Sequence, residues 1–173
     1  IVSIADSVSC FGLADGKDSV SVAGGTPGYT YLWTNGDTTS ISDTLAFTGL
    51  LDSCFVTDAN GCVAWDTITM FEPDILIATV TTLDSVSCAG LLDGIDSVSV
   101  VGGTPGYTYA WQDTSNLGLN ILPNANVNNN LGVGNYICIV TDTNSCQDTS
   151  NILAMFEPVV LTATDTAFPA ICF

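Results

Sequence analysis

The sequence predicts an all-β chain that contains two tandem β-sandwich units. The first observation is a repeat: the sixteen residues 18–33 return as residues 96–111 with two changes. The second is that apolar and polar residues alternate within both copies, as in strands with one buried face. The third is the run Gly-Gly-Thr-Pro-Gly inside each copy, which predicts a turn because glycine tolerates positive φ and proline cannot donate to a ladder. Each copy is therefore a strand, a tight loop and an aromatic strand.

Cysteine spacing sets the length of the repeating unit. Cys10 recurs as Cys88, and Cys62 recurs as Cys146, at offsets that are each a little under half of the chain. Units of this size can each bury a modest sandwich core. The final Cys-Phe pair also echoes Cys10-Phe11, which predicts that the chain is a window of a longer array. The expected domains are a first repeat at residues 1–73, a second repeat at 74–158 and the start of a third repeat at 159–173.

The other elements of the first unit are short strands, and the second unit repeats their order. Residues 1–10 predict an edge strand, and Asn35-Gly36 predicts a two-residue hairpin turn. Further strands are expected at residues 41–45, 53–58 and 62–71, with a turn at 59–61 and a break at Glu72-Pro73.

One loop of the second unit is longer than its counterpart. The interval from Trp111 to Cys138 exceeds the equivalent interval from Trp33 to Cys54 by six positions, so the second unit carries an insertion. The insertion is rich in asparagine, which favours turns and left-handed conformations. This predicts a surface loop of variable length, with a binding loop within residues 112–133 as the alternative.

The charge balance excludes two classes of partner. Lys17 is the only basic residue against 18 acidic ones, which gives a formal net charge of −17. Nucleic acids and anionic membranes are bound through basic side chains, so neither is an expected partner. No apolar run approaches the roughly 20 residues of a spanning helix, so membrane insertion is not expected. Seven cysteines in small β units, with no histidine, favour an oxidising, extracellular location.

The residues used for acid–base catalysis are almost entirely missing. The chain has no histidine and no arginine, and Glu72 and Glu157 are equivalent positions that each precede a proline. A paired-carboxylate hydrolase needs two acids that face one cleft. We therefore interpret these glutamates as linker residues and expect no enzyme.

Carboxylates beside glycines are candidate calcium ligands. They are Asp15, Asp18, Asp93 and Asp96. Calcium needs about six to eight oxygen ligands, and the sequence offers no complete set. The favoured interpretation is that these side chains hydrogen-bond the backbone of their own turns, so no metal or other cofactor is predicted.

Two tryptophans close the aromatic strands. Trp33 shares its strand parity with Tyr29 and Tyr31, and Trp111 is its counterpart. A buried tryptophan that anchors a sandwich core is the expected role, with a sugar-binding platform as the alternative. Trp65 has no counterpart in the second unit and does not separate these two roles.

The ordered set of motifs resembles a known family of repeats. Its members here are Val-Ser-Cys-Phe-Gly at 8–12, Asp-Gly at 15–16, the repeated stretch from 24 to 33, Val-Thr-Asp-Ala-Asn-Gly-Cys at 56–62 and Phe-Glu-Pro at 71–73. Together they are similar to the SprB-type repeat of Bacteroidota gliding-motility and cell-surface adhesins. One departure is Asp52, which stands where the second unit has Tyr136.

The resemblance implies immunoglobulin-like β-sandwiches strung along a very long surface protein that the type 9 secretion system exports. The implied function is a structural stalk or filament segment of a secreted, repetitive adhesin, linked to surface adhesion or gliding. Its partners would be neighbouring repeats of the same chain and lateral copies in a filament. The alternative function is a carbohydrate-binding β-sandwich module, which predicts exposed aromatic side chains or a shaped loop.

Sequence alone leaves the disulfide pairing open, because six cysteines in two units allow about fifteen pairings. The resemblance favours two pairs, since these positions recur in relatives that have only two cysteines. They are Cys10 with Cys62, and Cys88 with Cys146. Cys54 and Cys138 would then be buried thiols. In the rival pairing, which resembles the inter-sheet bridge of immunoglobulins, Cys54 and Cys138 replace Cys62 and Cys146.

Aspartate precedes serine or threonine more often than composition explains. Twelve of the 16 aspartates do so, whereas random placement gives roughly three to four. Asp-Ser/Thr followed by Ala, Ile, Leu, Val, Met or Thr resembles the O-glycosylation acceptor that Bacteroidota use on exported proteins, so covalent O-glycans are expected. The alternative is that these pairs solubilise exposed strands. The matching acceptors are Ser7, Ser19, Thr38, Thr44, Thr67, Ser85, Ser97 and Thr166.

Overall fold

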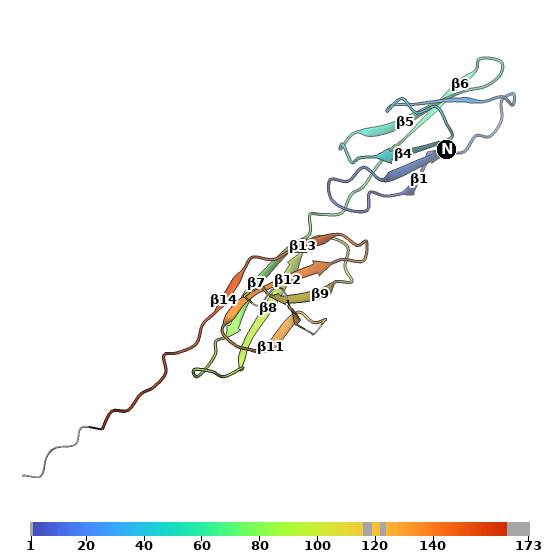
Figure 1. Ribbon diagram of the computed structural model, residues 1–173. Coiled ribbons are helices and arrows are strands. Elements are labelled where there is room, and N and C mark those ends of the chain that lie inside the picture. The colour runs from blue at the N-terminus through green and yellow to red at the C-terminus, as the bar shows by residue number, and fades with distance from the viewer. Residues whose placement is uncertain (1, 116–118, 122–123, 166–173) are drawn as a thin grey trace, which may run out of the picture. The chain divides into compact units, whose positions relative to one another are not determined.

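Figure 1 shows the computed structural model of the protein, which describes residues 2–115, 119–121 and 124–165. These residues form strands and no helix, which confirms the all-β prediction. No helix long and apolar enough to cross a membrane occurs among them.

The first six strands form two three-stranded sheets. One sheet has the order β1-β2-β4 and the other β3-β5-β6, and neighbouring strands run antiparallel. This is the strand order of an immunoglobulin-like sandwich, with strands A, B and E in one sheet and C, F and G in the other. The strands are β1 (Val2–Asp6), β2 (Gly16–Val20), β3 (Thr30–Trp33), β4 (Ile41–Leu45), β5 (Leu51–Thr57) and β6 (Val63–Thr69).

The other described strands repeat this order with additions. One sheet is β11-β8-β7, and the second is β10-β9-β12-β13 with β14 also paired to β12. Strand β10 lies within the insertion that we expected to be only a loop, and it pairs with the aromatic strand β9. The strands are β7 (Ile77–Asp84), β8 (Gly94–Val101), β9 (Thr108–Asp113), β10 (Leu119–Ile121), β11 (Val127–Leu131), β12 (Gly134–Thr141), β13 (Gln147–Thr149) and β14 (Leu153–Met155).

The tight turn predicted at Asn35-Gly36 forms, but the prediction that it joins two paired strands is wrong. Gly36 has a φ of 97°, and its N–H donates to the Trp33 carbonyl at 3.0 Å. The chain then crosses to the other sheet, where β4 pairs with β2 and not with β3. The turn at residues 59–61 does join two paired strands, β5 and β6, as predicted.

By compactness the described chain divides into two units. The first contains the residues up to Ala78 together with Val100–Thr108 and Val140–Asp148, and the second contains the rest. This division cuts strands β7, β8, β9, β12 and β13, so the repeat boundaries at residues 73 and 158 stay a prediction. The same holds for a third repeat from residue 159, whose residues 166–173 lie outside the described part of the chain.

Equivalent residues build the core in both sets of sheets. One buried triad recurs at matching positions: Val8, Leu45 and Met70, and then Val86, Leu131 and Met155. Trp33 and Trp111 are 2% and 0% exposed. Their indole N–H groups donate to backbone carbonyls, Trp33 to Thr39 at 2.8 Å and Trp111 to Ala125 at 2.9 Å. The core role predicted for both tryptophans is therefore confirmed.

Tyr136 adds a feature that the first sandwich lacks. It lies two residues before Cys138 in β12, and its hydroxyl donates to the Gly132 carbonyl at 3.1 Å. A tyrosine in this place, bonded to backbone a few residues upstream, is the tyrosine corner of immunoglobulin-like sandwiches. Asp52 occupies the equivalent position in β5, where burial raises its carboxyl pKa.

Two equivalent glycines differ in how tightly they are packed. Gly24 and Gly102 have φ values of 80° and 72°, a region that favours glycine. A Cβ built on Gly24 would have no neighbour within 4 Å, whereas one on Gly102 would lie 1.9 Å from the carbonyl oxygen of Ile75. The Gly102 backbone therefore approaches the chain around Ile75 too closely for any side chain.

Candidate functional site

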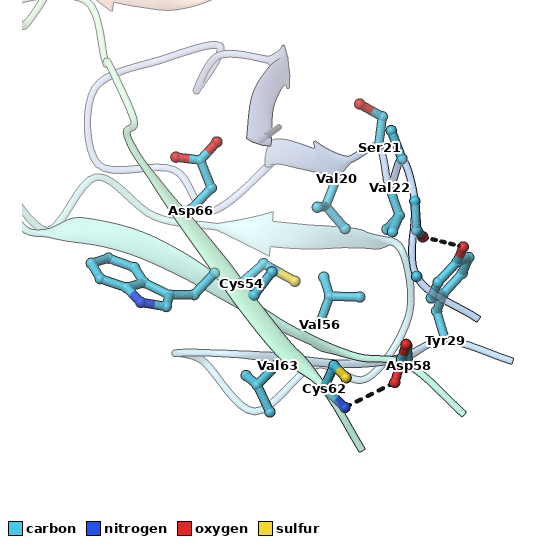
Figure 2. Close-up of a pocket in the computed structure, with 15 residues that line it drawn as sticks. Val20, Ser21, Val22, Tyr29, Cys54, Val56, Asp58, Cys62, Val63 and Asp66 are labelled. Carbon is cyan, nitrogen blue, oxygen red and sulfur yellow. Dashed lines mark hydrogen bonds between the residues drawn. The ribbon is translucent and has the colours of Figure 1, made fainter. Parts of the chain in front are cut away.

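A groove of about 360 Å³ opens in the first unit, beside the end of β2, the loop that follows it, and strands β5 and β6 (Figure 2). Val20, Cys54 and Val56 give it an apolar side, and Figure 2 shows their side chains gathered in its middle. Asp58 and Asp66 contribute carboxylates, and no basic side chain lines the groove. It therefore suits an uncharged ligand with an apolar face better than an anion.

An exposed aromatic pair lies on the strands that border this groove. Phe55 and Trp65 are opposite each other in the β5–β6 register, with ring centroids 6.2 Å apart. They are 40% and 65% exposed, and Trp65 also lines the groove. The sequence analysis missed the pair, although a signal was present: Phe55 has the strand parity opposite to the core residues Cys54 and Val56 and so faces outward.

Two thiols line the groove, the buried Cys54 and the exposed Cys62. Burial raises the pKa of the Cys54 thiol. A thiol becomes reactive when a nearby base or cation stabilises the thiolate; the charged side chains of the described lining are the carboxylates of Asp58 and Asp66, and it contains no cation.

Asp58 explains why two separated motifs occur together. Its carboxylate accepts hydrogen bonds from the N–H groups of Thr26 at 2.9 Å and Cys62 at 2.8 Å. It also accepts from the N–H of Asn60 at 2.9 Å. These bonds hold its pKa below the usual range, with the Thr26 contribution the largest. One side chain thus ties the Gly-Gly-Thr-Pro-Gly loop to the turn that carries Cys62.

In the second repeat, an aspartate accepts the equivalent set of backbone hydrogen bonds. Asp142 accepts from the N–H groups of Thr104 at 2.8 Å, Asn144 at 2.9 Å and Cys146 at 2.9 Å. The motif residues therefore specify the loops at one end of each sandwich, because the aspartate satisfies backbone donors that a turn leaves without partners.

The four candidate calcium ligands serve other roles. Asp15 accepts from the N–H of Ser9 at 2.9 Å and from its hydroxyl, and Asp93 does the same for Ser87. The serine hydroxyl bond is the main cause that lowers the pKa of each of these two carboxyls. No group of three or more metal-ligating side chains forms within the described residues.

Asp18 and Asp96 point into the interior instead. Both are 0% exposed, because they share strand parity with Val20 and Val98. The two carboxylate oxygens of Asp18 have no hydrogen-bond partner in the described structure. Burial first, and then the nearby Asp52 charge, raise the pKa of Asp18 to about 6.

The predicted disulfide pairing is wrong. The structure pairs Cys10 with Cys146, with Cα atoms 5.7 Å apart, and leaves Cys62 and Cys88 as exposed free thiols. The rival pairing is wrong as well, because Cys54 and Cys138 are free and buried.

The reason is that each sandwich carries its cysteines at opposite ends. The Cys10 loop is held beside the end of β6, where Gly12 N–H donates to Glu72 Oε2 at 2.9 Å. Cys62 directly precedes β6, which is seven residues long. A strand of that length spans about 23 Å, far beyond the reach of a disulfide. The same bond shows that Glu72 fastens a loop and is more than a linker residue.

The predicted glycosylation acceptors are accessible to different degrees. None of those in the described residues is buried. Ser7, Thr38, Thr44 and Ser85 are exposed, Ser19, Thr67 and Ser97 are half-buried, and Thr166 lies outside the described residues.

Comparison with known proteins finds one family. The family model of the SprB repeat matches residues 2–38 and 80–116. No curated protein matches the chain. Among solved structures, the crystal structure of murine CEACAM1b has a TM-score of 0.40 and 12% identity, and the match covers 91% of this chain and 100% of that one.

Proposed function

Because the chain carries two SprB-type repeats, which mark repeat segments of cell-surface adhesins, we propose that it is a structural stalk segment of a long, secreted adhesin. In this role the repeats act as spacers that hold a binding region away from the cell, and they catalyse nothing. Their partners are neighbouring repeats of the same chain, lateral copies in a filament and covalent glycans. Export through the type 9 secretion system and a part in gliding belong to the same proposal.

The observation that supports a spacer is the equivalence of the two repeats. The core triads, the buried tryptophans and the aspartate clamps at Asp58 and Asp142 all recur at matching positions. A binding module keeps one specialised surface, whereas a spacer needs only that each unit fold and stack. The recurring residues are those that specify folding.

An experiment in the parent adhesin separates a spacer from a binding module. Deleting residues 1–158 should weaken adhesion, and replacing them with two other SprB-type repeats of different surface sequence should restore it. Surface changes such as Trp65→Ala should leave adhesion unchanged. Failure of the replacement to restore adhesion would contradict the spacer role.

Glycans on the acceptor serines and threonines would protect the stalk segment. Bulky sugars on exposed strands would shield a repetitive β surface from proteolysis and edge pairing. We expect the protein from its native source to be heavier than the bare polypeptide, with the excess on Asp-Ser/Thr peptides. Replacing Ser85 with alanine should remove one glycan, whereas replacing Ser99, which does not follow aspartate, should remove none. A native mass equal to that of the polypeptide would exclude glycosylation.

Carbohydrate binding is the second candidate, and the Phe55–Trp65 pair favours it. Exposed aromatic rings can stack on sugar faces, and Trp65 of this pair also lines the groove. If the groove binds a glycan, Trp65→Ala should abolish retention on that glycan, and Phe71→Ala should not. Phe71 is a matched control because it is 62% exposed, close to the 65% of Trp65, and does not line the groove. Absence of any retained glycan would end this candidate.

A further inference from the structure

Two exposed thiols occupy the same repeat positions as the two halves of the disulfide. Cys10 and Cys88 are equivalent, and so are Cys62 and Cys146. The disulfide uses one of each kind, Cys10 from the first copy of the repeat and Cys146 from the second. Cys62 and Cys88 remain free and exposed within the described residues.

The disulfide is part of a larger contact. Asn144 Nδ2 donates to the Ser9 carbonyl at 2.9 Å, and Cys146 Sγ lies 3.3 Å from the same oxygen. All of these residues belong to the first compact unit. The contact therefore joins a Ser-Cys pair on one side to an Asn-x-Cys turn on the other.

Each side of this contact, the Ser-Cys pair and the Asn-x-Cys turn, occurs a second time in the chain, where the other side does not contact it. Ser87-Cys88 repeats the Ser-Cys pair, in a loop that Asp93 fixes by accepting from the Ser87 N–H at 3.0 Å. Asn60 and Cys62 repeat the Asn-x-Cys turn, with the same internal hydrogen bonds as at residues 144–146. Each free half is thus already held in the conformation that the bonded half adopts.

Neither free thiol is bonded within the described residues, although Cys62 and Cys88 are themselves one cysteine of each kind. The two complementary cysteines, Cys10 and Cys146, already bond to each other. Cys62 and Cys10 also lie at opposite ends of one sandwich, separated by the length of β6. Cys88 lies in the loop that Glu157 fastens through Gly90 at 2.6 Å, whereas Cys146 lies before β13, in the turn that Asp142 holds.

We propose that Cys88 and Cys62 each form a disulfide with a further SprB repeat, Cys88 with the cysteine equivalent to Cys146 and Cys62 with the cysteine equivalent to Cys10. Repeats would then be joined head to tail by one disulfide per junction, in addition to the polypeptide itself. The inference goes beyond a spacer role and does not depend on what the adhesin binds. A second copy of this chain carries both complements and is the partner used to test it.

The chemistry is a two-electron oxidation of two thiols. The Cys88 thiolate attacks a small-molecule disulfide such as oxidised glutathione, which forms a mixed disulfide and releases one glutathione thiolate. The Cys62 thiolate of the second copy then attacks the Cys88 sulfur and releases the second glutathione. Two protein thiols lose their protons and become one disulfide, and one oxidised glutathione becomes two reduced ones.

The test mixes two variants, each of which keeps only one of the two free thiols, Cys62 or Cys88. All variants in this test, the double variant included, also carry Cys172→Ser, because Cys172 is a further cysteine of the Cys10 kind in the sequence. Cys62→Ser then retains Cys88, and Cys88→Ser retains Cys62, so only the mixture contains both halves. In a glutathione redox buffer at high protein concentration, the mixture should give a disulfide-linked heterodimer. Each variant alone should stay mainly monomeric, the unchanged chain should give a ladder of multimers, and the double variant should give none. Electrophoresis without reductant and mass spectrometry of the Cys88–Cys62 peptide are the measurements.

A second variant tests whether the asparagine–serine contact beside the disulfide, and not thiol exposure alone, determines which cysteines pair. Asn60→Ala in the Cys88→Ser background removes the amide equivalent to Asn144, which bonds the Ser9 carbonyl. The heterodimer yield at equilibrium should fall about 2- to 10-fold, the value expected for one hydrogen bond. Alkylation of Cys62 in the unmixed variant should stay unchanged, which shows that the thiol itself is intact and accessible.

Two outcomes would overturn the proposal. One is that homodimers through Cys62–Cys62 or Cys88–Cys88 form as readily as heterodimers, because pairing would then follow exposure alone. The other is that no intermolecular disulfide forms while both variants remain folded by circular dichroism. Neither outcome bears on the adhesion experiment with replaced repeats, so this inference and the spacer role can fail separately.

Discussion

Replacing Asp18 with asparagine tests whether a buried carboxyl governs the pH dependence of stability. Asp18 lies in β2, is 0% exposed, and its carboxylate oxygens have no hydrogen-bond partner in the described structure. Asparagine has nearly the same shape and no charge. The substitution therefore removes the cost of burying the ionised form while it leaves the packing almost unchanged.

The sign and size follow from the raised pKa. Burial, with a smaller effect of Asp52, raises the carboxyl pKa from 3.8 to about 6, so the folded state binds more protons than the unfolded state between these values. Stability is then highest below the unfolded pKa and is lost as the pH rises through about 6. The full difference corresponds to about 3 kcal/mol. Solvent screening reduces this, so we expect Asp18→Asn to gain about 1–2 kcal/mol at about pH 8 and little at about pH 3, below the unfolded pKa.

Urea unfolding followed by tryptophan fluorescence at both pH values gives the measurement. Asp43→Asn is the matched control, because it removes one charge from an exposed residue of the neighbouring strand β4 and tests the effect of net charge alone. The reasoning would be refuted if the gain from Asp18→Asn were the same at both pH values, or if Asp43→Asn gave an equal gain.

Three further predictions follow from packing. Tyr136→Phe should cost about 1 kcal/mol in thermal unfolding, since it leaves one backbone carbonyl without its buried partner; an unchanged midpoint would show that the tyrosine corner contributes no stability. Gly102→Ala should destabilise more than Gly24→Ala, because both incur about 1–2 kcal/mol of left-handed strain but only the first clashes with backbone; equal losses would contradict the clash. Burial raises the pKa of Cys138 to about 11, so iodoacetamide should label Cys88 in the native protein and reach Cys138 only after unfolding; rapid native labelling of Cys138 would show that it is not buried.

Strand parity made much of the fold predictable, and its incomplete use caused one error. Alternation placed Trp33 in the core correctly. The same alternation places Asp18 beside Val20 on the buried face, yet we considered Asp18 a calcium candidate because it lies near a glycine. The position of a residue in its strand decided its environment, and its neighbours in sequence did not.

The disulfide and the groove could not be derived from sequence. The pairing depends on which end of a sandwich each cysteine occupies, and a sequence carries only spacing and order. The aspartate clamp that fixes the Cys62 turn against the Thr26 loop is visible only in three dimensions. The aromatic pair depends on Trp65 and Phe55 meeting across β5 and β6, and Trp65 has no repeat equivalent that would have drawn attention to it.

The place of Lys17 limits how this chain can be digested. Trypsin-type proteases cut after lysine or arginine, so the 173 residues offer them one bond, between Lys17 and Asp18. That bond lies in β2, the middle strand of the sheet β1-β2-β4, and its second residue is buried. Proteases need an extended segment that has left its sheet, and cleavage normally falls at loop tips. Folding therefore hides the one trypsin-sensitive bond, and digestion would have to wait until the first sandwich opens.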